Sequence, residues 1–351
     1  MLRLLALFVV SCTMCIMPIQ AAQELYLRDN LGRAQTGDFI VTSSNKNYTL
    51  LHIYDKTERS LVMEEITVPD SKINLQNSTW AAWVQNGAPC HTSWVMYEID
   101  LPSGQMLEFF SFTKNGWMDL GKADNFLSAL LNLRLYKVPE QQRKRIGPKS
   151  SGDFDFRKIW QPPMIVGGHQ IHDVPFDAWH TVWPKDGSEL SGKSIDVYLP
   201  QHPEMYLSYF PYWLQISGVI GKAKIRIIDS GKQLVSPKPM LPRRPPEFLD
   251  SGKVMGDKLM FAVKTWPYYR SFSLTAVESL QPSVEGDEKI SMYYTLPFTV
   301  QSSDTPNVVF LAVALKDVQA TLPAGSAYFF FLQPSGFPQI FAKTKDPLLV
   351  K

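Results

Sequence analysis

Apolar and polar residues alternate along the stretch from Ala178 to Leu234, and the rest of the chain can be placed around it. Ile195, Val197 and Leu199 are separated by polar residues, and the same period of two returns from Lys222 to Ile227. This period puts apolar side chains on one face of a strand and polar side chains on the other. The pattern therefore predicts an antiparallel meander with one solvated face.

Two further segments before the meander show a clear pattern. His91–Leu101 and Met106–Thr113 are joined by Pro102-Ser103-Gly104, which favours a hairpin. The apolar residues of 123–136 recur at spacings of three and four, with Asp124 near the start, which predicts a helix packed on a sheet. A short helix is also expected from Asn77 or Ser78 through Gln85.

The C-terminal part reads as a separate domain. Residues 236–253 are rich in proline and predict a semi-rigid linker. Six short apolar runs follow, and this spacing is typical of a β-sandwich. The fold class predicted is mainly β: a curved antiparallel sheet with a packed helix over residues 23–235, followed by a C-terminal β-sandwich over residues 254–351.

Residues 1–22 resemble a signal peptide, with Arg3 before an uncharged, mostly apolar run. We therefore expect an exported protein of the periplasm or outer envelope. Two alternatives stay open at this end of the chain: an uncleaved anchor, and a lipid on Cys12. No other stretch predicts a membrane-spanning helix.

Composition narrows the functional classes. The chain has 351 residues and a formal net charge of +2, so nothing in its charge favours nucleic acid as a partner. Aromatic residues reach 12% and charged residues only 19%, which is typical of a β-rich globular protein. No motif implies a cofactor.

One motif has to be discounted. Residues 187–194 match the phosphate-loop pattern GxxxxGK[ST]. That loop requires a buried strand before it and a helix after it, whereas the residues that follow alternate like a strand and run into Pro200 and Pro203. We interpret the motif as a hairpin turn.

Two sets of residues could support catalysis or metal binding. His169, His172, Asp173 and His180 are metal-capable side chains within twelve residues, although their spacing fits no helical metal motif. Cys90 precedes His91, but neighbours on a strand point to opposite faces, so His91 is badly placed to activate the thiol. These residues define the enzymatic alternative, an envelope hydrolase, and we lean against it.

Aromatic residues crowd the central meander. Trp179, Trp183, Tyr212 and Trp213 are candidates for stacking on sugars or lining an apolar cavity, and burial in the core is the simpler interpretation. The leading hypothesis is a non-enzymatic envelope protein. It would bind an apolar or lipid ligand, a carbohydrate, or an envelope protein partner. A structural interaction module, docking through the C-terminal sandwich, is a further alternative.

A resemblance supports this assignment. The segment APCHTSWVMYEIDLPSGQMLEFFSFTKNGW (88–117) and the meander ending in KAKIRIIDSGKQL are similar to exported proteins of unknown function in chlamydia-type bacteria. The resemblance implies no catalytic residue. The plan of long antiparallel strands with one covering helix also resembles periplasmic lipoprotein-carrier folds, which is a likeness of fold and not of function.

Overall fold

The structure, a computed structural model, describes residues 23–74, 78–120, 126–148, 155–218, 222–279 and 292–350. Residues 1–22, expected as a signal peptide and containing Cys12, lie outside them. The chain divides into two compact units. The first holds the described residues up to Ala34, with Ile40–Asn45 and Ala129–Gly231, and the second holds Gln35–Phe39, Lys46–Ser128 and the residues from Lys232 onward. Residues 23–235, expected as one domain, are therefore divided between the units.

The first unit is built on the predicted meander. Its strands are neighbours in the order β1, β8, β11, β12, β13, β14 and β2, and those from β1 to β14 pair antiparallel. Their bounds are β1 Glu24–Tyr26, β8 Arg134–Lys137, β11 Phe176–Val182, β12 Ser194–Pro200, β13 Trp213–Ser217, β14 Lys222–Gly231 and β2 Phe39–Ser44. Ile195, Val197 and Leu199 are buried, as their alternation predicted.

Smaller elements complete the first unit. They are helix α1 Leu27–Leu31, the 3-10 turn η2 Glu140–Gln142, and a two-stranded ribbon of β9 Met164–Val166 and β10 His169–Ile171. Residues 144–146 and 158–160 also lie side by side, because the Trp160 amide donates to the Lys144 carbonyl at 2.8 Å and the Ile146 amide to the Lys158 carbonyl at 2.9 Å. This pairing holds a loop that the site uses.

The predicted helix over 123–136 is shorter than expected. Helix α3 spans Phe126–Leu131, and residues 121–125 lie outside the described part. Residues 134–137, assigned to the helix from sequence, form β8 instead and pair with both β1 and β11. The three-four spacing ends at Leu133, and beyond it two flanking strands supply hydrogen bonds that outweigh local helix propensity.

The second unit begins with an antiparallel sheet in the order β3, β4, β5, β6 and β7. The bounds are β3 Asn47–Lys56, β4 Ser60–Pro69, β5 Ser93–Asp100, β6 Met106–Ser111 and β7 Gly116–Trp117, with the 3-10 turn η1 Asp70–Lys72 and helix α2 Trp80–Gln85. The predicted hairpin is β5 with β6. Thr79 caps α2 in place of Ser78, since its Oγ1 accepts from the Ala82 amide at 3.2 Å, and Asn77 lies outside the described residues.

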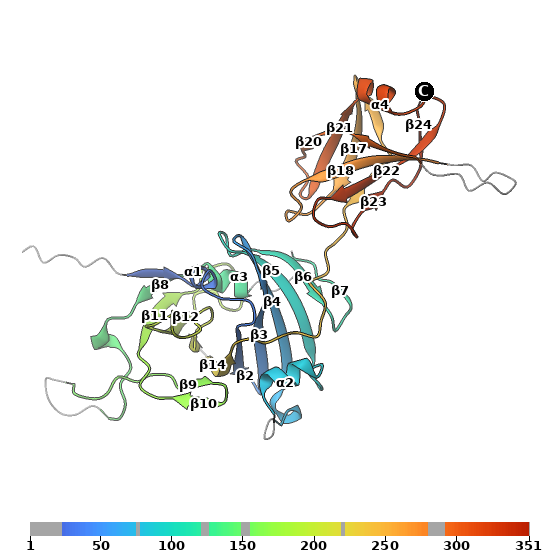
Figure 1. Cartoon of the computed structure of the whole chain (residues 1–351). Coiled ribbons are helices and arrows are strands. Elements are labelled where there is room, and N and C mark those ends of the chain that lie inside the picture. The colour runs from blue at the N-terminus through green and yellow to red at the C-terminus, as the bar shows by residue number, and fades with distance from the viewer. Residues whose placement is uncertain are drawn as a thin grey trace, which may run out of the picture. The chain divides into compact units, whose positions relative to one another are not determined.

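The proline-rich segment does not hang free between domains. Residues 234–245, here called the strap, cross the strands of this sheet (Figure 1). Leu241 of the strap is 2% exposed and packs with Val62, Met96 and Phe110. Trp117 Nε1 donates to the Pro242 carbonyl at 3.1 Å. Residues 236–245, a little over half of the segment expected as a linker, are therefore part of the packed structure.

One serine and two arginine side chains fasten the strap to three buried carboxylates of the sheet. Ser236 Oγ donates to Glu64 at 2.5 Å, and Arg244 Nε donates to Glu108 at 3.0 Å. Arg243 pairs with Glu98. Glu64, Glu98 and Glu108 are 0%, 5% and 1% exposed. Buried carboxylates need such partners, because desolvating an unpaired charge is costly.

The C-terminal sandwich contains two five-stranded antiparallel sheets. One has the order β15, β17, β21, β20, with β16 beside β17, and the other has the order β19, β18, β22, β23, with β24 beside β22. The bounds are β15 Glu247–Phe248, β16 Lys253–Met255, β17 Lys258–Lys264, β18 Phe272–Glu278, β19 Tyr293–Leu296, β20 Thr299–Ser302, β21 Val308–Ala314, α4 Leu315–Thr321, β22 Ala327–Pro334, β23 Ala342–Lys343 and β24 Leu348–Leu349.

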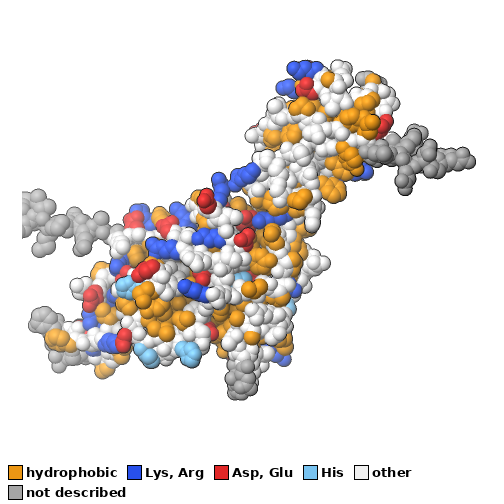
Figure 2. Space-filling model, viewed as in Figure 1, with side chains coloured by type: hydrophobic (Ala, Val, Ile, Leu, Met, Phe, Trp, Pro, Cys, Tyr) orange, Lys and Arg blue, Asp and Glu red, His pale blue; other side chains and the backbone are white. Residues whose placement is uncertain are grey.

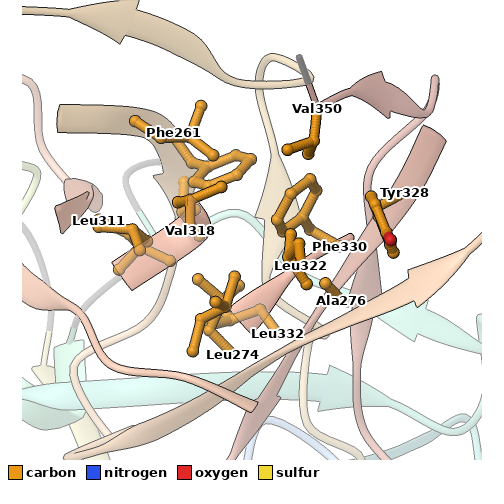
Figure 3. Packing of buried hydrophobic residues seen from close by; sticks show 14 of the residues in the cluster. Phe261, Leu274, Ala276, Leu311, Val318, Leu322, Tyr328, Phe330, Leu332 and Val350 are labelled. Carbon is orange, nitrogen blue, oxygen red and sulfur yellow. The ribbon is translucent and has the colours of Figure 1, made fainter. Parts of the chain in front are cut away.

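The sandwich core comes from alternating residues of the facing strands. Phe261 of β17 and Phe330 of β22 have ring centroids 4.7 Å apart, and Leu274, Leu311 and Leu332 surround them, as Figure 3 shows. All five are fully buried. Each side chain of this size contributes about 1.5–3 kcal/mol by leaving water. The predicted β-sandwich is confirmed.

One alternating run is not a single strand. The apolar pattern of 290–300 continues without a break, yet β19 pairs with β18 in one sheet and β20 pairs with β21 in the other. Pro297 lies between them, and a proline cannot donate to a sheet ladder. The chain therefore crosses between the layers at this point.

Surface charge is mixed. On the face shown in Figure 2, Lys and Arg side chains are interspersed with Asp and Glu. Among the residues that the structure describes, every helix is too short or too polar to span a lipid bilayer.

Candidate functional site: an aromatic cleft on the meander

The solvated face of the meander has a row of aromatic residues beside a row of polar residues. Tyr198 of β12 lies opposite Trp213 of β13, which lies opposite Arg226 of β14. Two positions away from these residues on each strand, the strand register brings a row of polar side chains side by side. This row contains His180, Asp196, Gln215 and Lys224.

A loop residue turns this face into a cleft. The indole of Trp160 packs edge-on against both Tyr198 and Trp213, with ring centroids 5.1 Å apart in each case. Trp160 and Trp213 are partly exposed, while Tyr198 is 8% exposed. The cleft has a volume of about 190 Å³, and Gln142, Asp196 and Gln215 also line it.

The loop is held in place by Arg143. Its guanidinium donates to the Phe176 carbonyl on β11 and to Gln161 Oε1 at 3.2 Å. The backbone pairing of 144–146 with 158–160 then sets Lys144 next to Trp160, and Lys144 Nζ lies 4.3 Å from the ring centroid. Three segments distant in sequence therefore converge on the cleft.

The acidic group of the cleft has a partner. His180 Nδ1 lies 2.7 Å from Asp196 Oδ1, and both side chains are partly exposed. Burial, followed by the negative charge of Asp196, raises the pKa of the Tyr198 hydroxyl, while Arg143 acts in the opposite direction. Tyr198 is therefore neutral at physiological pH and keeps a proton to donate.

The four aromatic residues proposed from sequence do not lie together. Trp213 is on the cleft face. Trp179 borders the cleft, but alternation along β11 turns its indole to the opposite face, and it is 5% exposed. Trp183 and Tyr212 are 4% and 1% exposed, with Trp183 Nε1 donating to Asp186 at 2.9 Å and the Tyr212 hydroxyl near Ser230. Those three are core residues.

Sequence reasoning missed Trp160 and Tyr198. Trp160 follows a stretch of turn formers and carries no periodic signal of its own. Tyr198 was visible only as the polar partner in an alternating strand. The alternation that put Ile195, Val197 and Leu199 inside also puts Tyr198 and Asp196 outside, so the strand pattern did contain part of the site.

The histidine candidates are not gathered into a metal site. His169 lies on β10, His172 follows it in an exposed loop, and Asp173 approaches Lys158 at 3.6 Å. His180 pairs with Asp196. Within the described ranges, no group of three or more His, Cys, Asp or Glu side chains could hold a metal ion.

The thiol candidate, Cys90, does not form a catalytic pair with His91. Cys90 is exposed in a turn with φ 68°, and the neighbouring His91 Nδ1 lies 2.8 Å from the Ala88 carbonyl. The His91 ring packs edge-on against Trp94. His91 is thus engaged with its own turn. Residues 187–194, the discounted phosphate-loop match, connect β11 to β12 without a helix.

A larger depression of about 610 Å³ lies elsewhere in the first unit, beside Arg145, Arg157 and His172. The two arginine side chains at this depression already pair with a carboxylate. Arg157 donates to Asp155 at 2.7 Å, and this hydrogen bond holds the pKa of the Asp155 carboxyl well below its usual range. Arg145 approaches the same carboxylate at 3.7 Å. We therefore favour the aromatic cleft as the candidate site.

Comparison with known proteins gives a likeness without a function. A family model described as "CT021 protein" matches residues 49–172. The chain resembles uncharacterised chlamydial proteins. The resemblance expected from residues 88–117 is therefore confirmed.

Among solved structures, the chain is similar to one of a chlamydial protein. It is the 2.0 Å structure of the hypothetical protein CT021 from Chlamydia trachomatis, with 22% identity and a TM-score of 0.47. The match covers 63% of this chain and 99% of that chain. No curated protein matches. None of these comparisons assigns an activity or a ligand.

Proposed function

We propose that this chain is an exported, non-enzymatic envelope protein that binds a carbohydrate in the aromatic cleft. The observation that supports this is the cleft's composition: the partly exposed indoles of Trp160 and Trp213 stand beside Tyr198, Asp196 and Gln215. Sugar rings present apolar C–H faces and a rim of hydroxyls. Aromatic rings and planar polar side chains match those two features.

The size and polarity of the cleft favour a sugar over a lipid. A volume of about 190 Å³ is below the roughly 300–1,000 Å³ of sites that enclose drug-sized ligands. One sugar ring can enter, and further units would lie along the polar row of the sheet. An acyl chain would instead need a continuous apolar channel, whereas here charged and amide side chains stand among the rings.

Export is the second part of the proposal, and its support is the pattern of residues 1–22. Expression in a bacterial host with an envelope, followed by fractionation and N-terminal sequencing, tests it. A mature chain that begins near Ala22 is expected. A full-length chain confined to the cytoplasm would contradict it.

Binding is tested with a panel of neutral and acidic oligosaccharides, titrated into the purified chain and followed by calorimetry and by the indole N–H signals in NMR spectra. We expect at least one glycan to shift indole signals that disappear in Trp160→Ala and Trp213→Ala, and to lose about tenfold or more in affinity in each variant.

Trp266→Ala is the matched control. Trp266 is also a partly exposed indole, with Arg244 and Lys264 over its ring, but it lies outside the cleft. Its removal should leave the affinity unchanged. A panel in which no glycan binds, or in which Trp266→Ala weakens binding as much as Trp213→Ala does, would contradict the proposed site.

A further inference from the structure

The charges around the cleft are unbalanced within the described residues. Asp196 is the only acid among the lining residues, and His180 already pairs with it at 2.7 Å. Lys144 lies in the lining, and Lys224 and Arg226 lie on β14 next to it. None of these three cations has an ion-pair partner among the described residues.

Two of these cations stand over aromatic rings that the ligand would use. Lys144 Nζ is 4.3 Å from the Trp160 centroid, and Lys224 Nζ is 5.6 Å from the Trp213 centroid. A cation over an indole is held weakly at an exposed site, by about 0.5–1 kcal/mol. An anion that arrives at the ring edge offers the ammonium group a stronger partner.

From this arrangement, we infer that the cleft selects an acidic sugar, one whose ring carries a carboxylate. The inference rests on the proposed glycan site and specifies its ligand. The sugar ring contacts Trp160 and Trp213, and its carboxylate recruits Lys144 and Lys224 from the two rings. A neutral sugar would leave these ammonium groups on the ring faces, where they compete with stacking.

The rest of the lining suits this division of roles. Gln215 and the hydroxyl of Tyr198 can serve sugar hydroxyls, which are neutral donors and acceptors. Asp196 would repel a carboxylate placed beside it. That repulsion favours a pose in which the ligand's anionic end lies toward Lys144 and Lys224.

The test uses a galacturonic acid trisaccharide and its methyl ester, in which each carboxylate charge is replaced by a neutral ester group. Calorimetric titrations of the full chain are made in about 50 mM salt, where screening of charges is weak, and in about 500 mM salt, where it is strong. We expect the acid to bind about tenfold or more tightly than the ester in low salt, since hydrogen bonds to a charged group are the stronger kind. The difference should shrink in high salt.

Substitutions of single lysines test whether the preference for the acid arises at the cleft. Lys144→Met should weaken the acid about tenfold without weakening the ester, and Lys144→Arg should retain most of the affinity for the acid. Lys343→Met is the matched control, because Lys343 Nζ also lies over an aromatic ring, 3.7 Å from the Phe329 centroid, but in the sandwich. Circular dichroism shows whether each variant is folded.

The outcomes separate the two proposals. Equal affinity for acid and ester overturns the inference and leaves glycan binding intact. Weakening of the acid by Lys343→Met to the same extent as by Lys144→Met also overturns it, because the effect would then be one of net charge. If neither trisaccharide binds and no glycan of the wider panel binds, the proposed function fails and the inference fails with it.

Discussion

Two histidine–carboxylate pairs of nearly equal geometry have opposite surroundings. His52 and Glu64, in the second unit, approach to 2.8 Å and are 2% and 0% exposed. His180 and Asp196, in the first unit, approach to 2.7 Å and are 43% and 40% exposed. The difference comes from what covers each face of the sheet, not from the pairs themselves.

The covered pair shows what a satisfied polar face looks like. Glu64 accepts from Trp94 Nε1 at 2.7 Å and from Ser236, and His52 Nε2 lies 3.0 Å from the Leu234 carbonyl. The strap supplies two of these partners. The exposed pair, His180 and Asp196, also has tryptophan and lysine side chains near it, yet no segment of the described chain covers it. We take the covered face as structural and the open face as available to a ligand.

The largest expected effect is the loss of an ion pair under the strap. Arg244→Met removes the cation that pairs with Glu108 and leaves this carboxylate with two neutral donors, the Tyr268 hydroxyl at 2.8 Å and the Phe109 amide at 2.9 Å. Removing one partner of a buried pair costs about 3–5 kcal/mol. Urea unfolding monitored by circular dichroism measures the loss, and hydrogen exchange in β5 and β6 localises it.

Arg134→Met is the control for that variant. Arg134 pairs with Glu24 on the surface, where solvent screens the interaction. We expect no measurable change in stability. If Arg244→Met were as harmless as Arg134→Met, the strap would not be fastened by its charges.

A smaller effect is expected from neutralising each carboxylate of the two histidine pairs. Glu64→Gln keeps an acceptor for Trp94 but removes the charge that faces His52, which should cost about 1.5–3 kcal/mol. Asp196→Asn should cost at most about 1 kcal/mol, because the pair is exposed. Chemical denaturation of both variants under one condition gives the ratio. Equal losses would show that cover does not distinguish the two faces.

The smallest effect concerns the neighbour of Glu64, which points to the other face of β4. Burial raises the pKa of Glu65 above its ordinary value of 4.5, although Tyr97, whose hydroxyl donates to it at 3.2 Å, acts in the opposite direction. The folded chain therefore retains a proton that the unfolded chain releases, and stability falls as pH rises from 4.5 through the folded pKa.

Glu65→Gln should remove that decline. The variant and the parent should have similar stability below pH 4.5, and the variant should be the more stable at pH 7. Urea titrations at both values measure the difference. A parent that is more stable than the variant at pH 7 would show that the folded state favours the charged carboxylate.

Alternation along single strands predicted most of the β structure. The hairpin of β5 and β6, the meander strands and the sandwich follow from a period of two and from turn residues, which act locally. Helix 123–136 failed at its C-terminal end because pairing with β1 and β11 decided the conformation of residues 134–137. Tertiary hydrogen bonds of this kind leave no trace in a local pattern.

The candidate site was less accessible to sequence reasoning. Trp213 was named for its place in an aromatic cluster, and Trp179 belongs to the same cluster but faces the core. Trp160 reaches the cleft through a loop anchored by Arg143, and its position depends on residues distant in sequence. The strap was recognised as proline-rich, but its buried carboxylate partners lie on β4, β5 and β6.

The entry of the strap depends on a position that has no room for a side chain. Gly37 has φ +91°, and a Cβ there would meet the Cα of Gln233 at 3.1 Å. The Gly37 amide donates to the Ile53 carbonyl at 2.8 Å, and its carbonyl accepts from the Leu234 amide at 2.9 Å. Two backbone hydrogen bonds of Gly37 therefore help to join the strap to the sheet, and only glycine adopts this conformation without strain. Random mutagenesis followed by selection for folding should therefore retain glycine at position 37, whereas the prolines of the strap should tolerate substitution.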